Sequence, residues 1–276
     1  MAELANWIET FITAKVRQDR ESFRFRDPIV GFAAADDPLY SQLDERIGTP
    51  QCHPRSMLPT ARTVVVYFLP FSLEIIRAIQ SQKVIVPEWS EQYTAANDLL
   101  SRISASLSGA LRQKGIAVAA GPPTNNYDPI ALTACWAHKA AAVIAGIGTF
   151  GLHHLIITPA GTAGRLNSLV MDAAVPLTRR PAHSYCLFES QGKCKICVEK
   201  CPSGALTVSG FDRFRCNAYL DGKNVHDLQQ GCSMCSSGPC AARIPPGLSG
   251  ERLAVPLSST DHAQEDLHEP FHRPRP

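Results

Sequence analysis

The sequence contains no apolar run long enough to cross a membrane. Its longest ones, Thr63 to Pro70 and Ala140 to Ile147, are far shorter than the roughly 18–20 residues that a membrane-spanning helix needs. Residues 1–20 lack the basic start and the uninterrupted apolar stretch of a signal peptide, and instead form an amphipathic helix pattern that includes Glu3 and Glu9. We therefore expect a cytoplasmic protein with no membrane partner.

An excess of charge of either sign is also missing. The chain has 27 Lys and Arg residues against 25 Asp and Glu residues, so it has no electrostatic footprint for nucleic acid. Nucleic acid is therefore not an expected partner. The 276 residues, with 45% hydrophobic and 19% charged side chains, are typical of a soluble globular chain with one large domain or two modest ones.

Cysteine is scarce in most of the chain and concentrated near its end. Only Cys52 and Cys135 lie within residues 1–185, and the other eight cysteines fall within residues 186–240. This shift in composition predicts a domain boundary near residue 185. In a protein that is not secreted, clustered cysteines are metal ligands or redox groups more often than disulfides. We expect Cys52 and Cys135 to be buried or incidental cysteines rather than ligands.

Upstream of residue 185 the pattern alternates between helix and strand. The predicted helices cover residues 4–17, 90–114 and 130–144, and the predicted strands cover 28–34, 63–68, 116–119, 155–158 and 166–173. The last two strands are separated by a glycine-containing turn, which favours a hairpin. The fold class that follows is α+β, a mixed sandwich. Residues 245–276 are rich in proline and poor in large apolar residues, and we expect a flexible tail there.

The cysteine spacing matches that of two-cluster ferredoxins. Cys194, Cys197, Cys201 and Pro202 reproduce the last three cysteines and the proline of the bacterial Cys-x2-Cys-x2-Cys-x3-Cys-Pro run, in which the cysteine before proline binds the other cluster. The position of the first cysteine holds Gln191, so Cys186 is the substitute. Crossed ligation then predicts two [4Fe–4S] clusters, with four cysteines each: Cys186, Cys194, Cys197 and Cys240 for one, and Cys201, Cys216, Cys232 and Cys235 for the other. The alternative is a pair of four-cysteine zinc sites.

A glycine-rich turn precedes the predicted strand 155–158. Gly146, Gly148 and Gly151 satisfy the G-x-G-x-x-G pattern of dinucleotide-binding proteins, but that turn should leave a strand and open a helix, whereas this one leaves a helix and enters a strand. We therefore predict no dinucleotide here. The glycines favour positive φ or a close backbone approach to a large planar ligand or another chain segment. A helix C-cap followed by a tight turn is the simpler alternative.

Several segments together resemble the epoxyqueuosine reductase family, which is related to the reductive dehalogenases. The resemblance covers about residues 55–240, and it depends mainly on the glycine turn and the cysteine set occurring together. The matching segments are Ala61 to Val66, Ala145 to Gly151, Leu155 to Pro159, Gly164 to Asp172, Cys194 to Ala205, Cys216 to Leu220 and Gly231 to Cys235.

The resemblance implies a nitroreductase-like, corrinoid-binding domain over residues 1–185 and a ferredoxin-like domain with two [4Fe–4S] clusters over 186–244, followed by the tail. It implies a cobalamin-dependent reductase, in which the clusters receive electrons from a donor such as ferredoxin or flavodoxin. The residues that we expect to contact the cobalamin are Gly146, Gly148, Gly151, His153 and Arg165. His153 and Arg165 could equally have structural or solvent-exposed roles.

Two departures from the family concern the substrate and the proton donor. The predicted tail stands where the family has a helical-repeat extension that helps hold tRNA, so we expect a small-molecule substrate. The family's catalytic aspartate position falls on Leu132, which cannot donate a proton. Tyr127 and Asp128 are the candidate catalytic residues instead, although Asp128 before Pro129 is also a plain helix N-cap. The alternatives are an electron-transfer protein without corrinoid and a corrinoid chaperone or processing protein.

Overall fold

A four-stranded antiparallel sheet forms the middle layer of the protein. The computed structural model describes residues 1–47, 51–82, 87–121, 127–222 and 231–248. The strands are arranged in the order β1-β2-β8-β3. Their bounds are β1 (Ile29–Ala34), β2 (Thr63–Pro70), β3 (Val118–Ala120) and β8 (Gly164–Met171).

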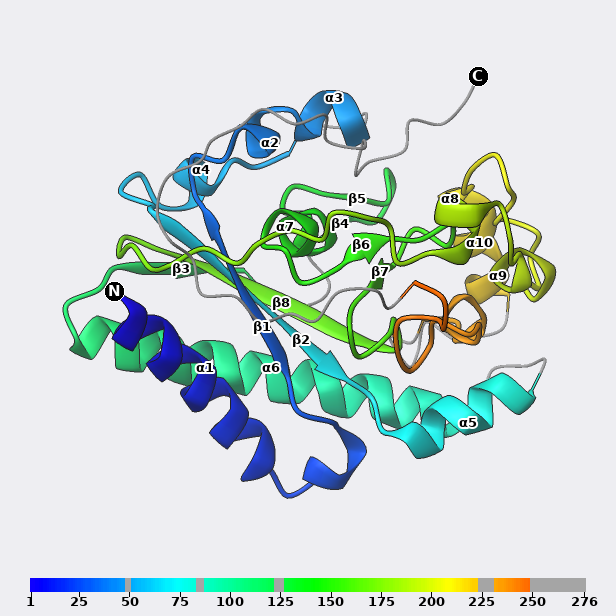
Figure 1. Ribbon diagram of the computed structural model, residues 1–276, viewed down its shortest axis with the longest axis horizontal. Coiled ribbons are helices and arrows are strands. Elements are labelled where there is room, and N and C mark those ends of the chain that lie inside the picture. Colours follow the sequence, from blue (N-terminus) through cyan, green and yellow to red (C-terminus); the bar gives the residue numbers. More distant parts are fainter. Residues whose placement is uncertain (48–50, 83–86, 122–126, 223–230, 249–276) are drawn as a thin grey trace.

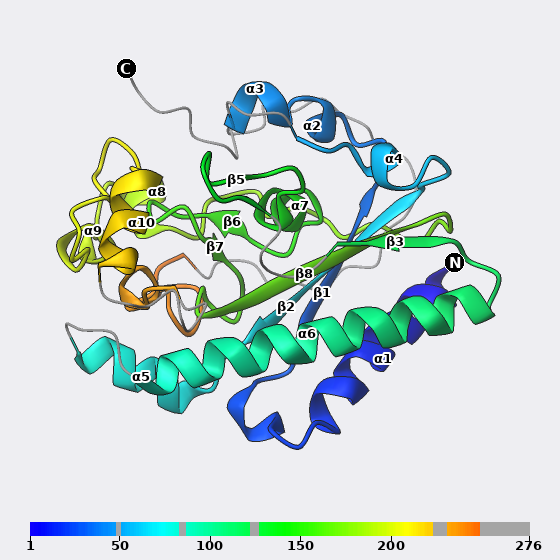
Figure 2. The same cartoon turned by 180° about the vertical axis from the view of Figure 1, so that it is seen from behind.

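The central strand β2 is buried along its whole length, because helices cover both faces of the sheet (Figures 1 and 2). Val65, Tyr67 and Leu69 belong to one hydrophobic core and Val64, Val66 and Phe68 to a second. This division follows from the two-residue period of a strand, which sends successive side chains to opposite faces. A continuous apolar run is therefore what a strand between two helical layers requires.

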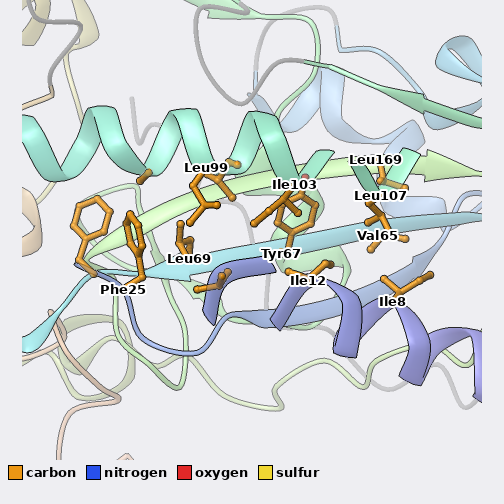
Figure 3. Packing of buried hydrophobic residues seen from close by; sticks show 14 of the residues in the cluster. Ile8, Ile12, Phe25, Val65, Tyr67, Leu69, Leu99, Ile103, Leu107 and Leu169 are labelled. Carbon is orange, nitrogen blue, oxygen red and sulfur yellow. The ribbon is translucent and has the colours of Figure 1, made fainter. Parts of the chain in front are cut away.

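The first core lies between the sheet and three long helices. These are α1 (Ala2–Arg17), α5 (Leu73–Ser81) and α6 (Pro87–Gln113). Helix α6 presents Leu99, Ile103, Leu107 and Leu111 at intervals of four residues, all fully or almost fully buried, and α1 adds Ile8 and Ile12 from the same side (Figure 3). The spacing of these residues keeps them on one face of each helix.

The second core is built around α7 (His138–Ile144), which lies against the opposite face of the sheet. Its small residues Ala140, Ala141 and Ala142 are all buried, and they let the helix approach β2 and β8 closely. Three short helices complete this layer: α2 (Pro38–Ser41), α3 (Leu43–Ile47) and α4 (Pro54–Met57). None of the helices in the described residues is long and apolar enough to cross a lipid bilayer.

The cysteine-rich segment lies at one end of the sheet, where β2 ends and β8 begins (Figures 1 and 2). It contains α8 (Leu187–Gln191), α9 (Ile196–Glu199), α10 (Arg213–Asp221) and the 3-10 helix η3 (Met234–Ser236). A further 3-10 turn, η1 (Ser22–Arg24), connects α1 to β1. The mixed helix and sheet fold that the sequence predicts is thus confirmed.

The predicted helix over 130–144 is wrong in its first half. Residues 127–134 instead form a hairpin of β4 (Tyr127–Asp128) and β5 (Thr133–Ala134). The Asp128 carboxylate accepts hydrogen bonds from the backbone N–H groups of Ile130 and Ala131, both at 2.8 Å, so it closes a turn rather than capping a helix. Leu132 then adopts a left-handed conformation with φ of 53°, which ends any helical path.

The predicted hairpin between residues 155–158 and 166–173 is also wrong. Strand β7 (Ile156–Ile157) pairs with β6 (Thr149–Phe150), whereas β8 pairs with β2 and β3. The intervening turn at Gly161 (φ 85°) packs against the backbone of Ala241, and this contact directs the chain into the sheet. Of the predicted tail, only residues up to 248 are described, so the prediction for 249–276 lies outside the described residues.

Two glycine substitutions should change stability in opposite directions. A Cβ at Gly31 in β1 would lie 2.5 Å from the Ala145 carbonyl oxygen, whereas a Cβ at Gly109 in α6 would meet nothing within 4 Å. We expect Gly31→Ala to lower the free energy of unfolding by about 1–3 kcal/mol and Gly109→Ala to raise it by roughly 0.4–1 kcal/mol. Urea denaturation followed by circular dichroism measures both, and equal effects would contradict the packing between β1 and α7.

Candidate metal centre

All eight clustered cysteines lie at the end of the sheet described above, and none of them forms a disulfide. Cys186 precedes α8 and Cys194 follows it in a left-handed conformation, with φ of 72°. Five others lie in or beside α9, α10 and η3, and the last one lies in the segment after η3. They are Cys197, Cys201, Cys216, Cys232, Cys235 and Cys240.

Four of the thiols share one small cavity. Cys186, Cys194, Cys197 and Cys240 line it together with His153. Burial, followed by the neighbouring thiols of Cys186, Cys197 and Cys194, raises the pKa of Cys240 to about 12. The pKa of Cys197 is raised to about 12 by burial and then by Cys186 and Cys194. The negative charges that these four thiols would carry therefore repel one another, which raises the pKa of Cys197 and Cys240.

The other four thiols form a second group. Burial raises the pKa of Cys216, with Cys201 as the next cause. The pKa of Cys232 rises to about 11 by burial, with smaller contributions from Cys216 and Cys201. Burial also raises the pKa of Cys235, followed by the effects of Cys232, Cys201 and Cys216 and, least, of Cys197 from the first group. The assignment of each group to one cluster stays a prediction.

Backbone N–H groups point at several of these sulfurs. Leu206 N lies 3.4 Å from Cys201 Sγ, and Leu152 N and Met234 N lie 3.5 Å from the sulfurs of Cys186 and Cys232. Such donors favour a sulfur that carries negative charge. Among the residues that the structure describes, no three Cys, His, Asp or Glu side chains are grouped closely enough to hold a single metal ion.

The metal centre is attached to the sheet by its last segment. Thr162 N donates to the Cys240 carbonyl at 2.9 Å, and Ala163 N donates to the Ala241 carbonyl at 3.0 Å. Ala241 is fully buried and belongs to the first hydrophobic core. Cys240 is therefore held by the residues that lead into β8 as well as by its own loop.

Arg26 joins the same segment to two other parts of the chain. Its guanidinium donates to the carbonyls of Phe71 (2.8 Å), Ala242 (2.9 Å) and Ala160 (2.7 Å). Burial lowers the pKa of Arg26. Nothing in the local sequence around Arg26 indicates this role, because its partners lie up to 216 positions away.

The three glycines of the glycine-rich turn lie against the protein's own chain. A Cβ at Gly146 would come within 2.6 Å of the Arg179 carbonyl oxygen, and one at Gly148 would meet the backbone and side chains of β7. Gly151 faces the ring of His153. Gly146 ends α7 in a left-handed conformation with φ of 71°, and Gly146 N and Ile147 N donate to the carbonyls of Val143 and Ala142, so here the structure has the helix C-cap that the sequence offers as the simpler alternative. Close approach of the chain to itself accounts for Gly148 and Gly151. Their role as cobalamin contacts stays a prediction.

His153 faces the first group of thiols. It is only 4% exposed, and its Nε2 lies 3.5 Å from Cys240 Sγ. Burial, followed by the neighbouring charges of His154 and Lys139, lowers the pKa of His153 to about 3. The His153 side chain therefore points inward, whereas His154, in a left-handed turn conformation with φ of 57°, is only partly buried.

Arg165 lies in a group of polar side chains that the sequence does not predict. Its Nε donates to Asn97 Oδ1 at 2.9 Å, and its guanidinium stacks over the Tyr93 ring at 4.2 Å from the centroid. Nearby, Lys139 donates to the His154 carbonyl at 2.9 Å. Arg165 is thus half-buried in the second position of β8 rather than in a solvated turn.

Tyr127 and Asp128 lie on the exposed β4–β5 hairpin, outside the cavity that the first four thiols line. The two backbone N–H groups that Asp128 accepts from lower its pKa, which favours the carboxylate over the proton-donating acid. A general acid at neutral pH needs the opposite shift. His138, by contrast, is buried, with Nδ1 2.8 Å from the Ser168 hydroxyl, which also accepts from Trp136 Nε1 at 2.8 Å.

The expectation that Cys52 and Cys135 are incidental is wrong. They form a disulfide with a Cα–Cα distance of 5.1 Å, and Cys135 is exposed between β5 and α7 rather than buried in a helix. Their sequence separation of 83 residues explains why spacing alone gives no sign of the pair.

Comparison with known proteins agrees with the predicted resemblance. No family model matches the chain. The epoxyqueuosine reductase of Yersinia pestis is 33% identical over 97 residues, which cover 34% of this chain and 22% of that protein. The chain resembles the epoxyqueuosine reductases. The match spans about a quarter of the length of the curated relatives.

Solved structures share the fold. An epoxyqueuosine reductase with a tRNA-Tyr epoxyqueuosine-modified stem loop matches with a TM-score of 0.52 at 17% identity, covering 88% of this chain and 70% of that one. A reductive dehalogenase whose structure suggests a mechanism for B12-dependent dehalogenation matches with a TM-score of 0.56 at 13% identity, covering 80% and 31%.

Removing the Arg26 guanidinium should loosen the metal centre. We expect Arg26→Met to lower the free energy of unfolding by roughly 2–4 kcal/mol, because buried carbonyl oxygens lose their donor. The control is Arg17→Met, which breaks an exposed ion pair with Asp27 at 2.7 Å and should change stability little. Guanidinium titration compares the variants, and equal stability of Arg26→Met and Arg17→Met would contradict the role of Arg26.

Proposed function

We propose that this chain is an iron–sulfur oxidoreductase that binds two [4Fe–4S] clusters and passes electrons through them, one at a time, to a bound cobalamin. The observation that carries the proposal is the gathering of eight free thiols at one end of the sheet, four of which, Cys186, Cys194, Cys197 and Cys240, line one cavity. Four thiolates are the ligand set of one cubane cluster. A nitroreductase-like domain and a ferredoxin-like domain are the architecture that we infer for the two parts.

The chain's own residues fit the clusters in chemistry as well as in number. Cys197 is buried and the other seven thiols are partly buried, and N–H groups of Leu152, Leu206 and Met234 approach the sulfurs of Cys186, Cys201 and Cys232. Burial, hydrogen bonds to sulfur and net charge are the properties through which a protein sets the potential of a cluster. Cys201 would bind the same cluster as the downstream Cys216, Cys232 and Cys235, and Cys240 would bind the same cluster as the upstream Cys186, Cys194 and Cys197. Each cluster would therefore have ligands from both sequence segments.

The cobalamin part of the proposal is supported by the shared fold with a B12-dependent dehalogenase. When bound, cobalamin would supply a strongly reducing cobalt centre. Of the five residues predicted to contact it, His153 is buried against Cys240 and the glycines face the protein itself. Arg165 is partly buried, with its guanidinium stacked on the Tyr93 ring, and it is the residue that we propose as a donor to the cofactor's amide or phosphate oxygens.

The substrate is open between two classes. We infer a small molecule from the balanced charge of the chain, with a ferredoxin or flavodoxin as the electron donor. The epoxyqueuosine reductase that binds a modified tRNA stem loop weighs against our expectation that nucleic acid is not a partner. Assays should therefore include an epoxyqueuosine-containing stem loop beside small halogenated and epoxide substrates.

Tyr127 and Asp128 remain our proposed proton donors. The lowered pKa of Asp128 makes the Tyr127 hydroxyl the better of the two while the turn is closed. Donation by Asp128 would require the carboxylate to leave the N–H groups of Ile130 and Ala131. This proposal depends on the exposed hairpin meeting the substrate.

Metal analysis tests the first part of the function. Protein reconstituted without oxygen should contain about eight iron and eight sulfide per chain, and Cys216→Ala or Cys240→Ala should each remove about half of the iron. A double variant with Cys52→Ser and Cys135→Ser is the matched control, because it removes two cysteines outside both groups and should keep all of the iron. Stoichiometric zinc without a brown chromophore would disprove the clusters.

Gel filtration with cobalamin tests the second part. Reduced protein mixed with cob(II)alamin under anaerobic conditions should retain the corrin absorbance, and Arg165→Met should weaken binding roughly tenfold or more if a hydrogen bond to the cofactor from a charged group is lost. A protein that holds its iron but never retains corrin would instead be a plain electron-transfer protein. Retention of corrin without turnover of any substrate would favour a corrinoid chaperone.

Once a substrate turns over, the hairpin can be tested directly. We expect Tyr127→Phe and Asp128→Asn to slow turnover by about 10²–10⁴-fold if their protons are used, with no change in iron or cobalt content. Turnover at the parent rate in both variants would remove these residues from the mechanism.

A further inference from the structure

We infer that His153 is a positioning residue that donates a hydrogen bond to Cys240 and thereby raises the reduction potential of the cluster held by Cys186, Cys194, Cys197 and Cys240. The inference rests on the proposed function, and it assigns His153 to the metal centre instead of the corrinoid. It depends on the direction of two hydrogen bonds at one imidazole.

The first bond fixes which ring nitrogen carries the proton. Leu155 N–H donates to His153 Nδ1 at 3.1 Å. A ring nitrogen that accepts a hydrogen bond has no proton, so the proton of the imidazole is on Nε2. The assignment comes from a backbone N–H group, whose donor role does not depend on any choice of tautomer.

The second bond follows from the first. His153 Nε2 lies 3.5 Å from Cys240 Sγ, within the range of an N–H···S contact, and sulfur is the only one of the two partners that can accept. His153 also lines the cavity together with Cys186, Cys194 and Cys197. The ring is therefore a donor to a ligand sulfur at the edge of the first thiol group.

The surrounding turn holds the ring in this place. A Cβ at Gly151 would lie 2.8 Å from His153 Cε1, so the ring occupies space that only glycine leaves free at that position. His154 N donates to the Gly151 carbonyl at 2.8 Å, which closes the turn, and Lys139 donates to the His154 carbonyl at 2.9 Å. Gly151, the last glycine of the G-x-G-x-x-G pattern, thus leaves the space that the His153 ring occupies.

A donor to a ligand sulfur stabilises the additional negative charge of the reduced cluster, and second-shell donors of this kind tune metal centres. Removing the donor should make that cluster harder to reduce. The other cluster, bound by Cys201, Cys216, Cys232 and Cys235, has no such contact with His153 and should keep its potential.

The experiment compares two amide variants in the full chain carrying both clusters. His153→Asn keeps an acceptor for Leu155 N–H but cannot reach Cys240, whereas His153→Gln places an amide donor near the Nε2 position. In anaerobic redox titrations followed by electron paramagnetic resonance, we expect His153→Asn to lower the ratio of reduced to oxidised cluster at a fixed potential about tenfold. This corresponds to a shift of about 59 mV for a one-electron couple.

His153→Gln should restore most of the parent ratio, and His183→Gln, which changes an exposed histidine, should leave both couples unchanged. The affected couple is assigned by its loss in Cys240→Ala. Equal shifts in His153→Asn and His153→Gln, or a shift of both couples, would reduce His153 to a packing residue and overturn the inference. If the parent protein binds no iron, the proposed function fails first and this inference fails with it.

Discussion

The convergence of three backbone carbonyls on the Arg26 guanidinium is the interaction on which the rest of the structure depends. The carbonyls of Phe71, Ala160 and Ala242 belong to the segment after β2, the turn before β8 and the end of the cysteine-rich segment. Carbonyl oxygens removed from water need donors, and a single planar cation with five N–H groups can satisfy several of them at once. The metal centre is thereby fixed to the end of the sheet.

From this attachment follows the arrangement of both thiol groups. Cys240 lies beside the start of β8 because its carbonyl accepts from Thr162 N, and there it meets the three thiols that the chain supplies much earlier. The glycine-rich turn reaches the same place from the other face of the sheet, where Leu152 packs with Cys197 and Leu206. Sheet, turn and cysteine loops therefore share one boundary, and each thiol group touches the larger part of the protein.

This arrangement has a consequence for electron transfer. The two thiol groups lie close together, because Cys197 of the first is among the causes that raise the pKa of Cys235 in the second. If both groups hold clusters, as we propose, this proximity would allow single electrons to pass from one cluster to the other.

Local patterns in the sequence were sufficient for much of the fold and for the concentration of eight cysteines in one segment. Three local signals illustrate this: the apolar run of β2, the four-residue spacing of apolar side chains in α6 and the spacing of the cysteines around Cys194. Strand β2 and helix α6 are present as these signals predict. Only the tertiary structure decided how these elements combine. Asp128 closes a turn instead of capping a helix, β8 pairs with β2 instead of β7, Cys52 meets Cys135, and His153 faces Cys240. Each of these outcomes depends on competition for hydrogen bonds or packing space, often between residues distant in the sequence, and no local period records which partner wins.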